Sequence, residues 1–465
     1  VTKTWEDNYG QDNTSRLTAL GSARPKMNLS TTSPAASSVA FFKLRSNQNT
    51  SEYKTVMNTK IVSWQKATKA QYEAALAATD NKIAVNTNLS YTSPEQAEDS
   101  EYNGTITVGT NTKVSNKPIY TWVDKDGNFY WYSQATEVYF YGSLNDFFNG
   151  DNGGSKSSIQ TADFTGISTA FVNNLQSFMN GCTNVSTIKI ELDCRSVNEN
   201  ILTVTKSSNL EYTFYECKKV TNANIKVQNT NNVSGCKGMF QKFSNDSRTT
   251  YATNDIVIDL SKCNFENVST FECMFQEARA VRYIIMYDKK TGVGLTTSTN
   301  LINMKQMFSQ CDLLCCEVET DLDFRGFNTS NVTNMSNLFF ECGWLTNLYI
   351  ESFNTSKVTD FGRFLDTQDI RGYYQSIGLA DTFWYTNLKR IYTSEDFQIS
   401  DTAITGGYFF RFHPNLAGEY NGSLFSRASN NDDKENSNYN FVDEQNIFNN
   451  RNNENNENKN VINSS

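Results

Sequence analysis

Apolar residues in the middle of the chain first follow the spacing of a helix and then alternate as in a strand. The helical pattern occupies positions i, i+3, i+6, i+7 and i+10, which are Val332, Met335, Leu338, Phe339 and Cys342. This spacing predicts a helix with one buried face. Ser330 and Ser356 directly precede two such runs, so we expect their hydroxyl groups to cap the first free N–H groups.

A short strand is predicted after each helical run. Beyond Cys342, the apolar residues Leu348 and Ile350 alternate with Tyr349 and Glu351. Similar strands are expected near residues 185–190, 220–225, 256–260, 281–286, 322–324 and 388–391. One helix and one strand per unit, all running in one direction, would form a parallel sheet along one side of stacked units.

The combined pattern returns along the chain as an internal repeat. The segment from Phe327 to Ser356 begins and ends with Phe-Asn-Thr-Ser, and related runs end at eight anchor positions: Phe148, Met179, Phe214, Phe240, Phe275, Phe308, Phe339 and Leu365. Neighbouring anchors are 26 to 35 residues apart. Such periods are typical of repeats that must stack to bury their apolar stripes. We therefore expect the anchor rings to lie against one another.

The composition suits a thin structure better than a thick two-layer core. Hydrophobic residues are 38% of the 465 residues, and aromatic residues are 13%, so the apolar surface is concentrated in large rings. The net charge of −9 argues against nucleic acid and anionic lipid as partners. No run approaches the ~20 apolar residues of a membrane helix, so no membrane insertion is expected.

Three regions are predicted. Residues 1–117 carry no repeat: 1–38 should be loose, and 39–117 should form a small α+β or mostly β domain. In that domain Thr68 and Gln71 predict a capping box and a short helix, and Ser93-Pro94 predicts a second helix start. Residues 118–425 should hold the repeats, and the Asn-rich segment 426–465 should be disordered.

The repeat resembles a known family. The pattern resembles BspA-like leucine-rich repeats. It consists of Asn-Thr-Ser-Asn-Val-Thr-Asn-Met-Ser, then an apolar residue with Phe, a Cys three residues later and a Leu-rich strand. The resemblance is clearest over residues 327–366 and extends over about 118–400. It implies an α/β fold, a leucine-rich-repeat-like right-handed solenoid with a short parallel sheet. It also implies a secreted or surface-displayed binding protein, often an adhesin.

Four cysteines occupy the third position after an anchor: Cys182, Cys217, Cys311 and Cys342. Phe243 and Ala278 hold the same position in other repeats, which favours a buried apolar slot filled by free thiols. Disulfides between neighbouring repeats are an alternative, although parallel Cβ directions would strain them. Metal binding is a third alternative, which is disfavoured because the adjacent Cys315 and Cys316 are not a CxxC motif and a second pair is missing.

Candidate catalytic chemistry is sparse. His413 is the only histidine, which excludes sites needing two and disfavours a Ser-His-Asp triad. Glu191 and Asp193 share one strand face, but one such pair among 50 acidic residues is no more than chance. The chain has no P-loop, GxGxxG or GxSxG motif. We expect no catalytic residue, no metal and no cofactor.

Two further motifs have competing interpretations. Asp124 to Asn128 resembles part of a calcium loop, but Ala135 stands where the bidentate Glu should be, so a hairpin turn is favoured. Six rings near this turn could form a stacking platform, although alternation places about half of them in the core. They are Trp122, Tyr130, Trp131, Tyr132, Tyr139 and Tyr141.

The outward positions of the predicted repeat strands form the candidate ligand-binding surface. They are Lys189, Glu191, Asn224, Lys226, Asp259, Tyr287, Asp323, Arg325, Tyr349, Glu351 and Tyr392. We expect a non-enzymatic extracellular or cell-surface recognition protein that binds a host or matrix protein or a glycan. The alternative is a structural subunit of a filament or surface coat that self-associates through the ends of the repeat array and the terminal arms.

Overall fold

The computed structural model describes part of the unit Ser38–Ser465. The described residues are 38–42, 61–77, 84–86, 89–90, 95–96, 105–108, 111–114, 117, 119–124, 126–148, 154–197, 210–245, 255–314, 322–366, 388, 390–394, 396–400, 402–404, 419–420, 423–424 and 448–449. Almost all of the predicted loose segment 1–38 and of the predicted disordered segment 426–465 lies outside them.

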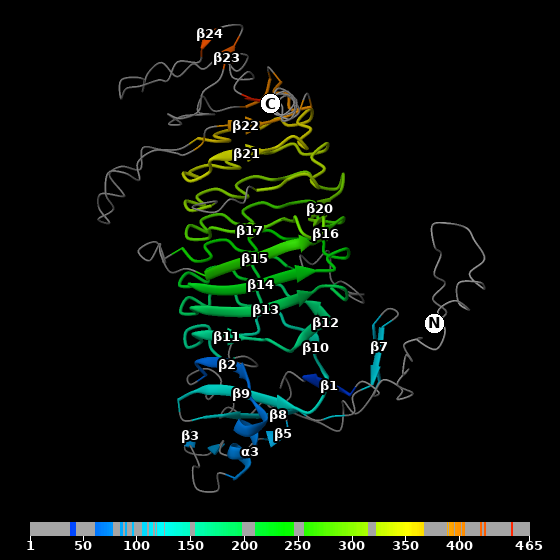
Figure 1. Cartoon of the computed structure of the whole chain (residues 1–465), viewed down its shortest axis with the longest axis vertical. Coiled ribbons are helices and arrows are strands. Elements are labelled where there is room, and N and C mark those ends of the chain that lie inside the picture. The colour runs from blue at the N-terminus through cyan, green and yellow to red at the C-terminus, as the bar shows by residue number, and fades with distance from the viewer. Residues whose placement is uncertain are drawn as a thin grey trace, which may run out of the picture. The chain divides into compact units, whose positions relative to one another are not determined.

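β-Strands dominate the described residues, and nine of them join one sheet in the order β5–β8–β9–β2–β11–β13–β14–β15–β17. In that order they span Glu95–Gln96, Ile119–Val123, Asn128–Ser133, Ser63–Lys66, Thr161–Asp163, Thr187–Asp193, Asn222–Gln228, Asp255–Lys262 and Ile284–Ile285. Neighbours from β9 to β17 are parallel, whereas β8 is antiparallel to β5 and β9. Figure 1 shows β13, β14 and β15 side by side.

Smaller sheets complete the described strands. Two have three strands: β1 (Val39–Phe42), β10 (Glu137–Ser143) and β12 (Ser168–Asn174), then β21 (Asn347–Tyr349), β22 (Arg390–Tyr392) and β25 (Phe448–Asn449). Five are pairs: β3 (Ala84–Asn86) with β4 (Leu89–Ser90), β6 (Thr105–Val108) with β7 (Asn111–Val114), β16 (Asn264–Phe265) with β20 (Thr296–Thr297), β18 (Tyr287–Asp288) with β19 (Val293–Gly294), and β23 (Glu419–Tyr420) with β24 (Ser423–Leu424).

Strand β2 is inserted between strands that come much later in the chain. Ser63 pairs in register with Asn128 of β9 on one side and Thr161 of β11 on the other. β1 likewise pairs with β10. Strands β1 and β2 therefore each share a sheet with strands beyond residue 118. The boundary at residue 117 stays a prediction.

The predicted fold, an α/β leucine-rich-repeat-like right-handed solenoid, is wrong. Among the described residues the only helix is α3 (Lys69–Ala77), and none of the predicted repeat helices forms. The strands expected near residues 185–190, 220–225, 256–260, 281–286, 348–350 and 388–391 are confirmed as β13, β14, β15, β17, β21 and β22. The strand expected at 322–324 is wrong, because only an isolated bridge from Asp323 to Tyr349 forms there. The structure is mostly β, and the reason lies in the backbone of the predicted helical runs.

The run that begins at Met335 consists of two consecutive β-turns. The N–H of Leu338 donates to the carbonyl of Met335 (3.2 Å), and the N–H of Cys342 donates to that of Phe339 (3.3 Å). The third residue of each turn has positive φ, 55° at Asn337 and 58° at Glu341, as a type II turn requires. The turns place residues 335, 338, 339 and 342 inside, which mimics the apolar spacing of a helix.

Alternate N–H groups of this run bond to the next repeat instead of closing helical turns. Those of Met335, Asn337, Phe339 and Glu341 donate to carbonyls of residues 360, 362, 364 and 366, at 2.8 to 3.0 Å. Earlier repeats have the same left-handed residues, including Tyr212, Glu216, Lys242, Cys273, Glu277, Gln306 and Gln310. Hydrogen bonding between repeats therefore replaces the i→i−4 pattern of a helix.

The predicted anchor register is confirmed. From Met179 onward, each anchor N–H donates to the carbonyl just before the next anchor, as from Phe275 to Met307 (2.8 Å) and from Phe308 to Leu338 (3.0 Å). The ring of Phe275 stacks on Phe240 at 5.1 Å and on Phe308 at 5.4 Å, and Phe308 stacks on Phe339 at 5.7 Å, with interplanar angles of 2°, 4° and 4°. These rings form one continuous buried column.

The Phe-Asn-Thr-Ser motif joins neighbouring repeats rather than starting helices. Asn328 Oδ1 accepts hydrogen bonds from the N–H and hydroxyl of Ser330 (3.2 and 2.7 Å). Thr329 is 1% exposed; its hydroxyl donates to the carbonyl of Asn354 (2.9 Å) and accepts from the N–H of Asn354 (2.8 Å). Ser356 bonds to Asn354 as Ser330 does to Asn328, so the predicted helix caps are wrong.

The free-thiol interpretation of the cysteine slot is confirmed. No disulfide joins the four residues predicted to fill it, and all are buried: Cys182, Cys217, Cys311 and Cys342. The thiol of Cys342 donates to the carbonyl of Phe308, 3.0 Å away in the preceding repeat. Burial raises the pKa of the Cys182 and Cys217 thiols, because the thiolate would lose its hydration.

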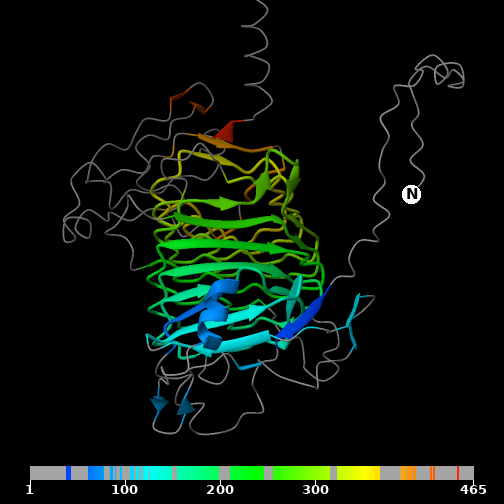
Figure 2. The same ribbon diagram turned by 60° about the horizontal axis from the view of Figure 1, so that its bottom comes forward.

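Helix α3 begins at the predicted capping box. The N–H of Thr68 donates to Gln71 Oε1 (2.8 Å), and the N–H of Gln71 donates to Thr68 Oγ1 (3.2 Å). The helix lies over β8 and β9 (Figure 2), and Tyr72 stacks on Tyr132 at 4.5 Å. The second helix start predicted at Ser93-Pro94 is wrong, because Glu95–Gln96 is strand β5.

We expect Gly326→Ala to lower the free energy of unfolding by about 1–3 kcal/mol, the usual range for overpacking. A Cβ at Gly326 would stand 2.0 Å from the carbonyl oxygen of Leu295, so the backbone must move. Gly343→Ala is the matched control, because a Cβ there meets nothing within 4 Å. Urea denaturation of both variants tests this, and equal midpoints would contradict it.

Candidate functional site

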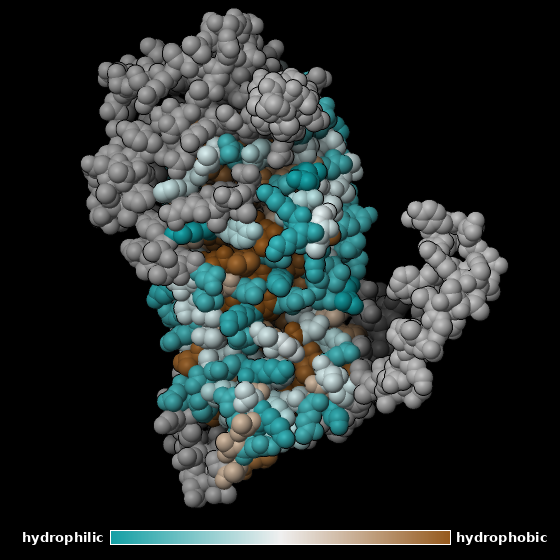
Figure 3. Space-filling view, in the orientation of Figure 1, coloured by the Kyte–Doolittle hydropathy of each residue, from teal (hydrophilic) through white to brown (hydrophobic). Residues whose placement is uncertain are grey.

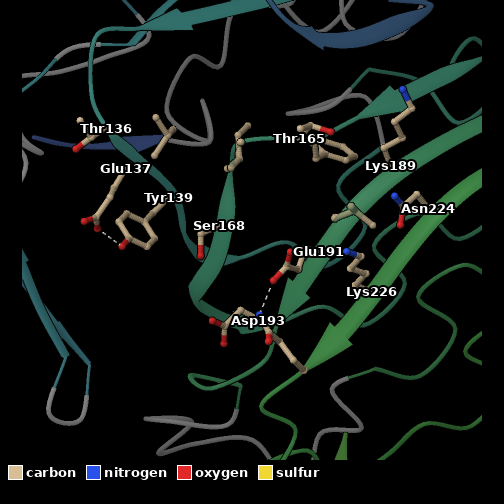
Figure 4. Close-up of a pocket in the computed structure, with 16 residues that line it drawn as sticks. Thr136, Glu137, Tyr139, Thr165, Ser168, Lys189, Glu191, Asp193, Asn224 and Lys226 are labelled. Carbon is tan, nitrogen blue, oxygen red and sulfur yellow. Dashed lines mark hydrogen bonds between the residues drawn. The ribbon is translucent and has the colours of Figure 1, made fainter. Parts of the chain in front are cut away.

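A groove of about 490 Å³ lies where the nine-stranded sheet meets the sheet of β1, β10 and β12. One side comes from the outward face of β13 and β14, and the other from β10 with the β11–β12 turn. Figure 4 shows Glu137 and Tyr139 on one side, Lys189, Asn224 and Lys226 on the other, and Ser168 and Glu191 between them.

The sheet side follows the predicted alternation of strands β13 and β14. Lys189 and Glu191 are exposed on β13, and Asn224 and Lys226 are exposed at the facing positions of β14. The residues between them are buried, because successive side chains of a strand point to opposite faces. Figure 3 shows hydrophilic residues over much of the face in this view, with hydrophobic areas along its middle.

Hydrogen bonds and ion pairs engage some of these side chains and leave others available. Lys189 pairs with Asp163 of β11 at 3.3 Å, and Glu191 accepts a hydrogen bond from Gln228 Nε2 at 2.5 Å. Within the described part of the chain, no hydrogen bond or ion pair reaches the side chains of Lys226 and Asn224. These two groups can therefore bind a ligand without breaking an existing contact.

The opposite side is fixed by aromatic packing. The ring of Tyr139 lies edge-on to Phe171 at 5.0 Å and 6.0 Å from Phe41. Its hydroxyl donates to the carboxylate of Glu137, the neighbouring outward residue of β10. Packing of the ring therefore also orients Glu137 toward the groove.

The carboxylate of Asp193 stabilises the local structure and is not available to bind a ligand. It is 6% exposed, and its carboxylate accepts hydrogen bonds from Arg195 Nε (2.9 and 3.0 Å) and Asn229 Nδ2 (2.9 Å). Hydrogen bonding to Asp193 raises the pKa of the Arg195 guanidinium. Glu191 and Asp193 share a strand side as expected, but only Glu191 is exposed.

The groove and its immediate contacts carry more negative than positive charge. The acids are Glu137, Asp163, Glu191, Asp193 and Asp259. The bases are Lys189, Arg195, Lys226 and Lys66, whose ammonium lies beside Gly166 of the lining. Five acids against four bases leave an excess of one negative charge. Asp259 is included because it faces Lys226 from β15.

Four of the eleven predicted binding residues thus gather at the groove, and others form a second cluster. Arg325 lies over the ring of Tyr287, with 3.9 Å from its guanidinium carbon to the ring centre. Asp323 accepts hydrogen bonds from Arg325 (2.9 and 3.0 Å), which raise the pKa of the guanidinium, and Asp323 faces Tyr349. Tyr349 faces Tyr392, whose side chain lies outside the described part.

Most rings of the possible stacking platform are packed inside. Trp131 is in the main core, and Trp122 and Tyr132 are buried beneath α3 with Tyr130 against them. Tyr139 lines the groove, and Tyr141 is 38% exposed. The hairpin interpretation of residues 124–128 is confirmed by the antiparallel pairing of β8 and β9. Asp124 accepts hydrogen bonds within this turn, from the N–H groups of residues 126 and 128.

Sequence reasoning missed the second side of the groove. Thr136, Glu137, Thr165 and Ser168 were not among the predicted binding residues, although the alternation of Glu137, Tyr139 and Tyr141 in the β10 segment was visible. The described residues contain no cluster of His, Cys, Asp and Glu that could hold a metal ion. They also contain no helix long and apolar enough to cross a bilayer.

Comparison with known proteins gives one family. Residues 192–290 and 302–399 each match a family described as Mycoplasma protein of unknown function, DUF285. The chain thus resembles, in two tandem segments, a repeat family of the surface-protein type, and the BspA-like resemblance is not confirmed. No curated protein and no solved structure matches the chain.

Proposed function

We propose that this chain is a non-enzymatic recognition protein of the cell surface or extracellular space, which binds its ligand in the groove between β10 and β13–β14. The observation that supports this proposal is that Lys226 and Asn224, which have no hydrogen bond or ion pair within the described residues, face Glu137 and Tyr139 across one open groove. Two tandem segments of the chain match a repeat family, and repeat arrays commonly bind partners through an extended surface. Open, largely preformed hollows with a few placed polar groups are typical of binding sites.

The double variant Glu191→Ala/Lys226→Ala should weaken binding to glycan arrays or immobilised matrix proteins about tenfold or more, since charged hydrogen bonds contribute about 1.5–3 kcal/mol each. The control is Asp255→Ala/Lys262→Ala, which also removes one acid and one base from exposed positions on the same sheet, outside the groove. Equal binding by both variants would contradict the proposal. So would release of new reducing ends from a bound glycan, because that would make the groove an active site.

A further inference from the structure

The backbone pairing of β13 is interrupted at the groove, and the interruption indicates what kind of partner the groove would hold. We propose that it takes an extended stretch of a partner polypeptide, whose main chain pairs with the backbone of Glu191. This inference rests on the proposed function of the groove. It follows from the hydrogen bonds of β13, the turn that ends β11, and the lining of the groove.

The main-chain N–H and C=O groups of Glu191 point toward the groove. In a parallel sheet, successive residues of a strand direct these groups to alternate neighbours. The N–H of Cys194 donates to Gln228 of β14 (3.0 Å), whereas the carbonyl of Lys189 accepts from the N–H of Phe164, just beyond β11 (2.8 Å). Glu191 comes two residues after Lys189, so its groups lie on the β11 side, where the groove is.

No strand occupies that side at the level of Glu191. β11 pairs with β13 only as far as Lys189. The chain then leaves the sheet in a tight turn, in which the carbonyl of Phe164 accepts from the N–H of Ile167 (3.1 Å) and Gly166 has a φ of 90°. Within the described residues, no hydrogen bond reaches the main-chain N–H or C=O of Glu191. One donor and one acceptor therefore face the groove without a partner.

The vacant position is that of a missing strand. On the other side of Glu191 the sheet continues without interruption, through Lys226 of β14 and Asp259 of β15. Two residues further along β13, the hydroxyl of Thr169 replaces a strand: it accepts from the N–H of Asp193 (2.7 Å) and donates to its carbonyl (3.0 Å). The open pair lies between this contact and the end of β11. A partner main chain placed there would restore the ladder with one β-bridge.

Bridges of a single residue already join segments of this chain. Asn303 pairs with Thr270 on one side and Asn334 on the other, in parallel and outside any strand. A partner segment can therefore pair at one level without needing a long free edge. Main-chain hydrogen bonding to an exposed part of a sheet is a recurring mode of peptide recognition.

The rest of the groove suits the side chains of a polypeptide. Its exposed surface is more apolar than polar, so apolar side chains of a partner can pack there. Five acids against four bases leave the surroundings close to neutral, so charge excludes neither an acidic nor a basic segment. Lys226 and Asn224 can donate to carbonyl or carboxylate oxygens of the same segment.

Amide hydrogen exchange followed by NMR on the full chain tests the pairing directly. The probes are heptapeptides selected on the immobilised protein from a random display library, and the glycans that an array shows to bind. In the free protein the Glu191 amide should exchange faster than those of Ile190 and Leu192, which point to β14. Saturation with a selected peptide should slow the exchange of the Glu191 amide about tenfold or more.

Two matched variants separate the main chain of Glu191 from its side chain. Glu191→Pro removes the open N–H, whereas Glu191→Ala keeps it and removes only the carboxylate. Peptide affinity should be about fivefold lower for the proline variant than for the alanine variant, the usual effect of one lost hydrogen bond. If the proline variant does not fold, the peptide carries the test. N-methylation of the peptide amide that donates to Glu191 should cause a similar loss, and N-methylation of the next amide, which points away, should not.

Three results would overturn the inference. They are the absence of any library peptide that slows exchange of the Glu191 amide, binding peptides that tolerate N-methylation at every position, and a glycan that slows this exchange when no peptide does. The proposed function would survive each result if binding to arrays or matrix proteins still fell in Glu191→Ala/Lys226→Ala. It would fail separately if that double variant bound as tightly as the unaltered chain.

Discussion

Phe275→Ala should lower the free energy of unfolding by about 3–5 kcal/mol, the usual cost of removing a buried phenylalanine ring. Phe275 is fully buried and stacks on Phe240 on one side and Phe308 on the other. Its loss would leave a cavity in the middle of the ring column and remove two ring contacts at once. Urea denaturation followed by circular dichroism measures the effect.

A smaller change at an exposed apolar position provides the comparison. Ile302 is 48% exposed, so Ile302→Ala should cost much less than Phe275→Ala in the same assay. Phe275→Leu should fall between them because it keeps part of the buried volume. A loss below about 1 kcal/mol for Phe275→Ala would mean that the ring column does not hold neighbouring repeats together.

Raising the pH above about 9 should destabilise the protein steeply, through its buried thiols. Burial raises the pKa of Cys273 to about 11 and raises that of five other thiols: Cys182, Cys194, Cys217, Cys236 and Cys263. Below the unfolded pKa both states hold the proton and stability is intact. Above it only the unfolded chain releases the proton, so each thiol removes about 1.4 kcal/mol per pH unit until its folded pKa is reached.

Urea midpoints measured between pH 8 and pH 10.5 under reducing conditions test this effect. Cys217→Ala is the matched variant, because Ala278 naturally fills the same slot in another repeat and both are buried. This variant should reduce the loss of unfolding free energy per pH unit by about 1.4 kcal/mol, which is the contribution of one thiol. A flat profile, or titration of the native thiols near pH 8.5 by ultraviolet absorbance, would refute the prediction.

The register of the repeats could be predicted from the sequence because each anchor is set by its own apolar neighbours. Phe240, Phe275, Phe308 and Phe339 align in the structure as the interval pattern predicts. Strands such as β13 and β14 were equally visible, since their alternation of buried and exposed residues is strict. Local periodicity is sufficient for both features.

The helices were predicted wrongly because periodicity does not report φ. Consecutive type II turns bury residues at nearly the same spacing as a helix, and only a left-handed third residue distinguishes them. Glycine would have given the signal, but Asn337, Glu341, Gln306 and Gln310 occupy those positions. The bonds to the next repeat keep these non-glycine residues left-handed, and sequence analysis of one repeat cannot show such bonds.

The candidate site was half predictable. Lys189, Glu191, Asn224 and Lys226 follow from strand alternation alone. Glu137 and Tyr139 on the other side depend on how the sheet of β1, β10 and β12 meets the large sheet. That meeting depends on pairings between residues about 100 positions apart, such as the bonds between Ser38 and Thr136.

The insertion of β2 sets an order of events during synthesis on the ribosome. β2 emerges first, yet the backbone partners on its two sides are made only when residues 128–131 and 161–162 have followed. The nascent chain must keep residues 63–66 unpaired through all that time. Later repeats have partners only 25 to 45 residues away, as from Met335 to Asp360 and from Thr359 to Ile404, so assembly should start among them and close over the N-terminal strands last.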